Sequence, residues 1–520
     1  MLASTAGGND AKTPALSLLP SELLHEILGA ADLASSTLFT LALSSRSFYH
    51  TALSLYLAKI GCPHPRERIT LAPPSTTDRC FDALTALRLP FFVDETEELV
   101  FISHSMDDPF LHHIARLQST LGRLRRFRRV VLRWKGRRIR DPPPSQLSSV
   151  YPALGLLLNT ILEKGCESLE IHGLNWTSDE YQCIPVFPSK SVLTTAVSSV
   201  RRILGLKQAF DSNESVLDGR YWKYRVFPGK TSIPMVTLST SARETTRLRK
   251  LAIDSYAMWT PPLLQWLYST LLTSPVEELK LANFQLENQS NLSWFVASSL
   301  FSEAVPHLKR LELGEFYYSS IQELNKWLGS KFQQLTSLTV GKLDLPWYAE
   351  LRDPAPSVLE SCPVLPNLEE LRVDGTWFTN TFKTFTEADF PNLRRLTIVT
   401  GLLRLASGTS VPEHPFVAAL KRLAVVHAKK HNRFTITLEW VAADVGEFYA
   451  STVAVGTQIL GDWVACISHL VLRLDGSQPL TVSSRRISEA GPPAAFALFL
   501  ARFVNAGPLQ IIGMDREEVS

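Results

Sequence analysis

Residues 308–340, LKRLELGEFYYSSIQELNKWLGSKFQQLTSLTV, decide the fold of this chain because they contain one complete structural repeat. The stretch begins and ends with the same pattern, in which apolar residues stand at the first, fourth and sixth positions: LKRLEL at 308–313 and LTSLTV at 335–340. Alternating apolar and polar residues are typical of a strand with one buried face. Between the two copies, SIQE at 320–323 is a capping box, and the apolar residues after it have helical spacing. The stretch therefore predicts a strand, a helix and a second strand.

The six-residue pattern recurs along much of the chain. Six copies between residues 248 and 398 start 25 to 33 residues apart. Further copies stand at 127–132, 166–171 and 467–472, whereas the pattern is weak over 172–247 and 404–466. A fixed motif at this spacing is typical of a solenoid in which each repeat packs against the next. The number of repeats stays open.

These copies resemble leucine-rich repeats, which commonly carry an Asn eight residues after the first leucine. Here that position holds Tyr256, Phe284, Phe316, Leu343, Thr376 and Gly401. In this respect the chain is similar to the irregular repeats of large fungal-type F-box proteins. We expect an α/β fold that is an irregular leucine-rich-repeat-like curved solenoid, with parallel strands on the concave side and helices on the convex side. A non-repetitive α/β domain is the alternative.

Residues 15–60 predict three short helices in front of the repeats. Pro20 suits a first helical turn, and the apolar residues that follow fall on one helix face. The order LPSELLHEIL at 19–28, then LAL at 41–43, then SRSF at 45–48 resembles an F-box. A helical hairpin that caps the domain behind it is the alternative interpretation.

The F-box resemblance implies a docking site for the Skp-type adaptor of a cullin-RING ubiquitin ligase. The residues that it implies for adaptor binding are Leu19, Pro20, Leu23, Leu24, Ile27, Leu28, Arg46 and Phe48. Ala31 departs from the family pattern, because a bulky residue usually stands there, and residues 35–37 lengthen the next connection. These departures bear on adaptor affinity more than on the fold.

The expected domain organisation has four parts. We expect a disordered tail over 1–14, the F-box over 15–60, a Pro-rich connecting segment over 61–122 and the repeat domain over 123–520.

The concave strands are expected to present a row of charges. The residues before the fourth position of the pattern point away from the core and lie across neighbouring strands. They are Lys250, Glu278, Arg310, Ser337, Glu370 and Arg395. The alternating signs fit either a solvated ladder of ion pairs or a mixed-charge surface for a protein partner.

The strongest concentration of charge is residues 123–140, with ten basic residues and no acidic one in a chain whose net charge is +3. Alternating apolar residues within it predict a strand with exposed arginines. The acidic run at 94–98 is a candidate counter-charge. As a functional patch, Arg125, Arg126, Arg128 and Arg129 would bind an acidic partner, RNA or an import receptor.

Nothing in the sequence indicates catalysis, a cofactor or a metal site. No nucleophile elbow, P-loop, dinucleotide fingerprint or zinc-protease motif is present, and the six cysteines form no CxxC pair. His112 and His113 would diverge on a helix, and His104 with Asp107 and Asp108 fits a turn better than a metal site. The cysteine spacing, the start of the chain and the lack of a long apolar run predict an intracellular protein without a membrane span.

The expected function is substrate recognition within an SCF-type ubiquitin ligase. The F-box would bind the Skp-type adaptor and through it the cullin scaffold, while the repeats would hold an unidentified protein target, with no chemistry performed by this chain. A repeat scaffold without a role in ubiquitin transfer is the alternative. A third hypothesis is RNA association through residues 123–140, since the near-zero net charge argues against nucleic-acid binding by the protein as a whole and leaves only this segment for it.

Overall fold

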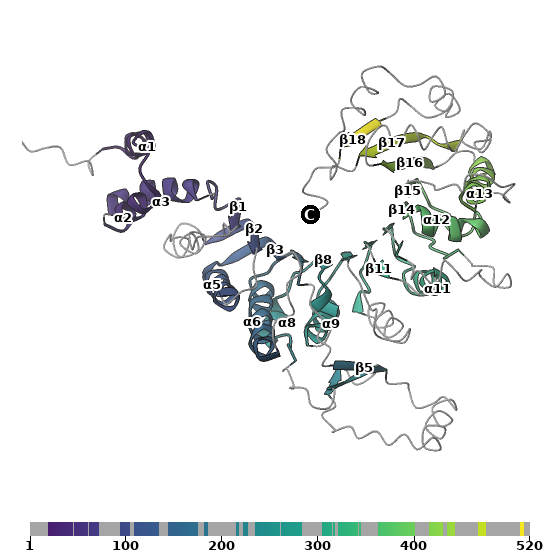
Figure 1. Cartoon of the computed structure of the whole chain (residues 1–520), viewed down its shortest axis with the longest axis horizontal. Coiled ribbons are helices and arrows are strands. Elements are labelled where there is room, and N and C mark those ends of the chain that lie inside the picture. Colours follow the sequence, from purple (N-terminus) through teal and green to yellow (C-terminus); the bar gives the residue numbers. More distant parts are fainter. Residues whose placement is uncertain are drawn as a thin grey trace, which may run out of the picture. The chain divides into compact units, whose positions relative to one another are not determined.

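A computed structural model shows the fold of the chain (Figure 1). It describes residues 19–44, 46–60, 62–71, 94–103, 109–134, 144–174, 181–185, 215–217, 222–226, 235–259, 262–282, 304–314, 316–317, 321–341, 343–344, 362–400, 415–429, 434–442, 466–474 and 510–513. The expected tail over 1–14 lies outside these ranges. The chain forms two compact units. Unit 1 comprises residues 1–178, 231–248 and 260–274, and unit 2 comprises residues 179–230, 249–259 and 275–520.

Unit 1 begins with the three expected helices, α1 (Ser21–Ala30), α2 (Ser35–Ser44) and α3 (Arg46–Lys59). They bury a small apolar core made by Leu24, Leu38, Ala42, Ala52, Leu53, Tyr56 and Leu57. Asp32 has a positive φ of 41° in the turn between α1 and α2. Lys59 on α3 lies 2.7 Å from the Asp32 carboxylate and 2.7 Å from the Leu33 carbonyl oxygen, so it ties this turn to α3.

The repeat-like part of unit 1 is a parallel sheet whose strands follow chain order: β1 (Arg68–Leu71), β2 (Glu95–Ser103), β3 (Arg126–Trp134) and β4 (Ser168–His172). Helices α5 (Pro109–Arg123) and α6 (Pro144–Glu163) lie along one face of it (Figure 1). Helices α8 (Thr240–Thr245) and α9 (Leu263–Thr273) belong to the same unit. The Trp266 indole N–H of α9 donates to the Asn159 side-chain oxygen of α6 at 2.9 Å, which joins these two helices.

This sheet corrects the interpretation of residues 61–122 as connecting structure. Strands β1 and β2 and all but the last residue of helix α5 lie in that segment. The six-residue pattern failed to find β2 because Thr96, which is buried but polar, occupies its first position. Thr96 pairs across the strands with Phe127, the first residue of the next copy, so the two copies are equivalent.

Among the described residues, the main sheet of unit 2 has nine parallel strands, again in chain order, each paired with the next of that sheet. They are β8 (Lys250–Asp254), β9 (Glu278–Ala282), β10 (Arg310–Leu313), β12 (Ser337–Val340), β14 (Glu370–Asp374), β15 (Arg395–Thr400), β16 (Thr435–Ala442), β17 (His469–Leu474) and β18 (Gln510–Gly513). Helices α11 (Ile321–Lys331), α12 (Gly375–Thr381) and α13 (Pro415–Lys429) lie along one face (Figure 1), with the short helices η2 (Tyr256–Trp259) and η3 (Phe382–Thr384) between elements. The pattern predicted most of these strands but missed β16 and β18.

Two smaller sheets complete unit 2. Strands β5 (Tyr181–Pro185), β6 (Ser215–Leu217) and β7 (Trp222–Val226) are antiparallel and fall where the repeat pattern is weak. Strands β11 (Phe316–Tyr317) and β13 (Leu343–Asp344) form a short parallel pair in which Phe316 faces Leu343. Both residues stand eight positions after the first leucine of their copy of the pattern, and the pairing of the two strands satisfies backbone groups there.

Glycines allow the turns after β10 and β12 to pack closely. The Gly314 N–H donates to the Leu281 carbonyl at 2.6 Å, and the Gly341 N–H donates to the Leu313 carbonyl at 2.5 Å. A Cβ at Gly314 would lie 2.7 Å from the Ala282 Cβ. The backbones therefore approach to a distance that a larger residue would prevent.

The mixed α/β fold with parallel strands and helices is thus confirmed. None of the helices in the described ranges combines the length and apolarity that a membrane crossing requires.

Candidate functional site

The surface of α1 exposes two large apolar side chains one helical turn apart. Leu23 is 46% exposed and Ile27 is 44% exposed, and Pro20 just before them is also exposed. Residues four apart on a helix lie side by side, so Leu23 and Ile27 form a continuous apolar strip. Leu24, by contrast, is 3% exposed. Its expected place on a docking surface is therefore wrong, because its side chain fills the core of the three-helix module.

The other residues implied by the F-box resemblance contribute less to this surface. Leu19, Leu28 and Phe48 are half-buried, and the side chain of Arg46 lies outside the described part of the chain. Leu43 on α2 is 57% exposed and adds an apolar surface residue that the resemblance did not single out. The strip formed by Leu23 and Ile27 is the clearest exposed apolar feature of α1.

The open face of the unit 2 sheet carries the expected row of charges. The strand registers align Lys250, Glu278, Arg310, Ser337, Glu370 and Arg395 in one row. Glu278 lies 2.8 Å from Lys250 and 2.9 Å from Arg310, and Glu370 pairs with Arg395. These side chains neutralise one another across the strands and are largely exposed, so each pair contributes at most about 1 kcal/mol.

A more buried ion cluster lies farther along the same face. Arg372 on β14 reaches across β15 and donates to both carboxylate oxygens of Glu439 on β16, at 2.5 and 2.7 Å. Arg473 on β17 lies 3.4 Å from the same carboxylate. The Glu439 side chain is only 9% exposed, and these two guanidinium groups balance its negative charge. The six-residue pattern did not find this cluster because it missed β16.

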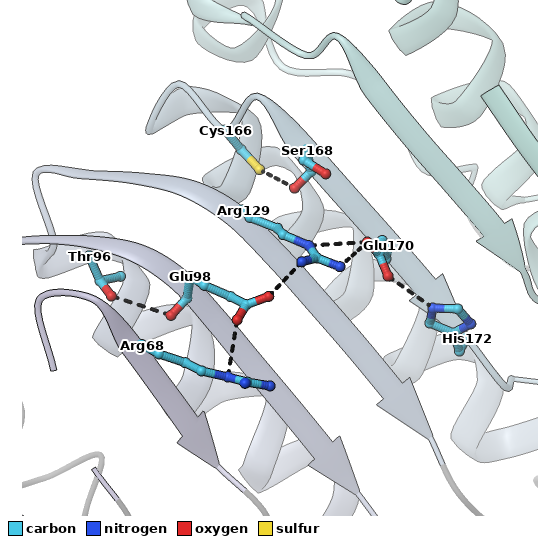
Figure 2. Close-up of polar contacts among 8 residues, drawn as sticks. All are labelled: Arg68, Thr96, Glu98, Arg129, Cys166, Ser168, Glu170 and His172. Atoms are coloured by element: carbon cyan, nitrogen blue, oxygen red, sulfur yellow. Dashed lines mark hydrogen bonds and ion pairs between the residues drawn. The ribbon is translucent and has the colours of Figure 1, made fainter. Parts of the chain in front are cut away.

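The open face of the unit 1 sheet carries a continuous ion-pair network over all four strands (Figure 2). Glu98 lies 3.0 Å from Arg68 and 2.9 Å from Arg129, while Glu170 lies 2.6 Å from Arg129 and 3.4 Å from His172. The His172 imidazole and the Arg129 guanidinium, against the opposing effect of burial, lower the pKa of Glu170 to about 2. Glu170 therefore stays ionised and holds Arg129 in place.

Three of the four arginines of the candidate basic patch are paired with carboxylates. Arg129 contacts Glu98 and Glu170, as described above. Arg126 lies 2.9 Å and Arg128 lies 3.2 Å from Glu167, and Arg128 lies 3.8 Å from Glu97. Arg125 is exposed, and its backbone N–H donates to the Asp94 carbonyl at 2.6 Å. The acidic run at 94–98 thus supplies part of the counter-charge, as the sequence indicated.

A polar cleft of about 680 Å³ lies at the amino ends of these strands. Its lining residues are Arg66, Glu67, Asp94, Glu95, Thr96, Glu97, Arg126, Arg128 and Glu167. Small-molecule pockets are mostly apolar, so this charged and open hollow does not resemble one.

Among the remaining candidates from the sequence, those that the structure describes are not grouped as a chemical site. Four cysteines in the described part of the chain, Cys62, Cys166, Cys362 and Cys466, are free thiols. Burial raises the pKa of Cys166 to about 12, which makes a nucleophilic role unfavourable. Within the described ranges, no group of His, Cys, Asp or Glu is placed to hold a metal ion. His104, Asp107 and Asp108 lie outside those ranges, and His112 and His113 lie on α5.

Comparison with known proteins adds no further assignment. No model of a known protein family matches the chain, and a search of curated proteins returns no significant match.

Proposed function

We propose that this chain is the substrate-recognition subunit of an SCF-type cullin-RING ubiquitin ligase. The observation that carries the proposal is the apolar strip of Leu23 and Ile27 on α1. The core of the three-helix module is built from other apolar residues, so Leu23 and Ile27 remain at its surface. Large apolar side chains that stay at the surface together are typical of a protein interaction site. The order of residues that resembles an F-box is the reason for proposing a Skp-type adaptor as the partner.

In this role the chain performs no chemistry itself. The helical module would hold the adaptor, and the repeat-like sheets would hold a protein target. Ubiquitin transfer would accelerate because the target lysines are kept at a high effective concentration near the ubiquitin-charged enzyme. The proposal places the protein inside the cell, in the cytoplasm or the nucleus.

The test is co-purification of the full chain with a Skp-type adaptor. We expect the double variant Leu23→Asp, Ile27→Asp to lose the adaptor, because two buried charges in an apolar interface remove most of its stability. Val425→Asp is the matched control, since Val425 is 50% exposed on α13 and lies in unit 2. Leu24 is unsuitable for this test because a charge there would unfold the module.

Two outcomes would overturn the proposal. If the double variant recovers as much adaptor as the wild type, the strip is not the docking surface. If the wild-type chain never recovers adaptor, the alternative of a repeat scaffold without a role in ubiquitin transfer is favoured.

A further inference from the structure

The open face of the unit 1 sheet is defined by three rows of residues that the strand registers align. The side chains on this face are Arg68, Thr70, Glu98, Val100, Ile102, Arg129, Val131, Arg133, Ser168, Glu170 and His172. Their alternate neighbours along the strands face the helices and form the core. Three arginines and two glutamates stand on this face, so it has one net positive charge when His172 is neutral.

Arg133 is the source of this excess charge. It is half-buried near the carboxyl end of β3, between Ile102 of β2 and His172 of β4 in the same row. The two glutamates of the face are already engaged, since Glu98 contacts two arginines and Glu170 contacts Arg129 and His172. Within the described residues, Arg133 forms no hydrogen bond or ion pair. A guanidinium group held on a rigid strand without a counter-ion is prepared to receive one.

We propose that this row, which we call the Arg133 row (Ile102, Arg133 and His172), binds an acidic segment of a partner protein. A carboxylate of the partner would accept hydrogen bonds from the Arg133 guanidinium. The partly exposed Ile102 beside it would contact an apolar side chain of the same segment. Figure 2 shows His172 next to Glu170, at the end of the network, where it adds a second polar group at the edge of the row.

The surroundings of Arg133 favour a protein over RNA. Single-stranded RNA is commonly held by aromatic side chains on which bases stack, together with a continuous track of cations along its backbone. Apart from the His172 imidazole, the eleven residues of this open face include no aromatic ring. The neighbouring cations are also interrupted by Glu98 and Glu170, which would repel consecutive phosphates. One isolated cation beside an aliphatic side chain suits a mixed acidic and apolar peptide instead.

The inference also divides the basic segment of the sequence. Arg126, Arg128 and Arg129 have structural partners, whereas Arg133 has none among the residues that the structure describes. The proposed binding residue of this segment is therefore Arg133, near the carboxyl end of β3, and not the arginines in the amino half of that strand. It does not depend on adaptor docking, because α1 and the Arg133 row are separate surfaces.

The experiment measures binding of the full chain to fluorescent peptides composed of Glu and Leu. Matched peptides with Gln in place of Glu, and an oligo-uridine RNA, serve as further probes. We expect the Glu peptide to bind and Arg133→Gln to weaken it about tenfold, as for loss of one partly exposed charge-assisted hydrogen bond. Arg133→Lys should retain most of the binding. Arg128→Gln removes the same charge from a paired, 65% exposed arginine and should change binding less than twofold.

Each alternative result contradicts the proposal. Equal binding of the Glu and Gln peptides would show that acidity is not recognised. Equal losses in Arg133→Gln and Arg128→Gln would show a general charge effect, and binding of RNA alone, abolished in Arg133→Gln, would assign the row to nucleic acid. Because Arg133 has no partner among the described residues, its variants should unfold at the wild-type temperature, which a thermal scan checks.

Discussion

Glu439 is the residue of unit 2 whose substitution should have the clearest effect on stability. Its carboxylate is 9% exposed, receives two hydrogen bonds from Arg372 and lies 3.4 Å from Arg473. Glu439→Gln keeps the shape of the side chain but removes its charge. It also turns an amide N–H₂ group toward a guanidinium group, so that donor faces donor.

The expected loss of stability in Glu439→Gln follows from the two cations, Arg372 and Arg473, that remain once this carboxylate is removed. Removing one partner of a fully buried pair costs about 3–5 kcal/mol, because the other charge is left desolvated. The side chains of Arg372 and Arg473 are 35% and 25% exposed, so hydration by water partly offsets the loss of their carboxylate partner. We therefore expect the lower end, about 3 kcal/mol, which corresponds to about a hundredfold change in an opening equilibrium.

Native-state hydrogen exchange is the appropriate assay, because a chain with two compact units does not unfold in one step. Amides of β14 and β16 should exchange about a hundredfold faster in Glu439→Gln. The control is Glu312→Gln on β10, whose carboxylate lies 2.8 Å from Lys280 but is 42% exposed. It should change exchange less than about tenfold. Equal effects of the two variants would refute the argument that burial makes the Glu439 cluster important.

Three further predictions concern unit 1. Gly173 has a φ of 84°, and a Cβ there would lie 2.2 Å from the Trp134 carbonyl oxygen. Gly173→Ala should therefore lower the free energy of unfolding of unit 1 by at least about 2 kcal/mol. The control Gly122→Ala, in open space on α5, should not destabilise the unit in thermal scans. The pKa of Glu170 is lowered to about 2 from an ordinary value of 4.5. Its stabilisation is therefore complete above about pH 4.5 and is lost as pH falls toward 2, so the wild type should exceed Glu170→Gln by at most about 3 kcal/mol at neutral pH and converge with it in acid. The Cys166 thiol, with its pKa raised to about 12 by burial, should resist alkylation in the native protein and react after denaturation, as peptide mass spectrometry would show.

The sequence predicted the repeated strand and helix elements well wherever apolar residues held every position of the pattern. It also predicted the charge row of unit 2, because these residues hold the same position in each copy of the pattern, which places Glu278 between Lys250 and Arg310. Strand β16 was missed because the six-residue pattern was applied as a whole. Its residues 435–440, TITLEW, alternate between polar and apolar, and this alternation alone would have indicated a strand.

The candidate sites were less predictable because they depend on which side chains meet. Leu23 and Leu24 are adjacent and differ by about 100° around the helix, so the apolar pattern could not say which faces the core. Glu170 on β4 and Glu167 just before that strand neutralise arginines of β3, and both follow those arginines by about forty residues in the sequence. Arg133 could likewise not be singled out from the sequence. It differs from Arg126, Arg128 and Arg129 in having no partner among the described residues, and composition does not show which side chains are paired.

The chain order of the strands has a consequence for synthesis on the ribosome. From β1 to β4, and again in the nine-stranded series from β8 to β18, each strand pairs with the strand of the same series that is made before it. A newly emerged strand therefore meets an already formed sheet edge, and pairing does not wait for a distant segment. In each of the two series, folding can follow translation one strand at a time, and the growing edge is covered as soon as the next strand emerges.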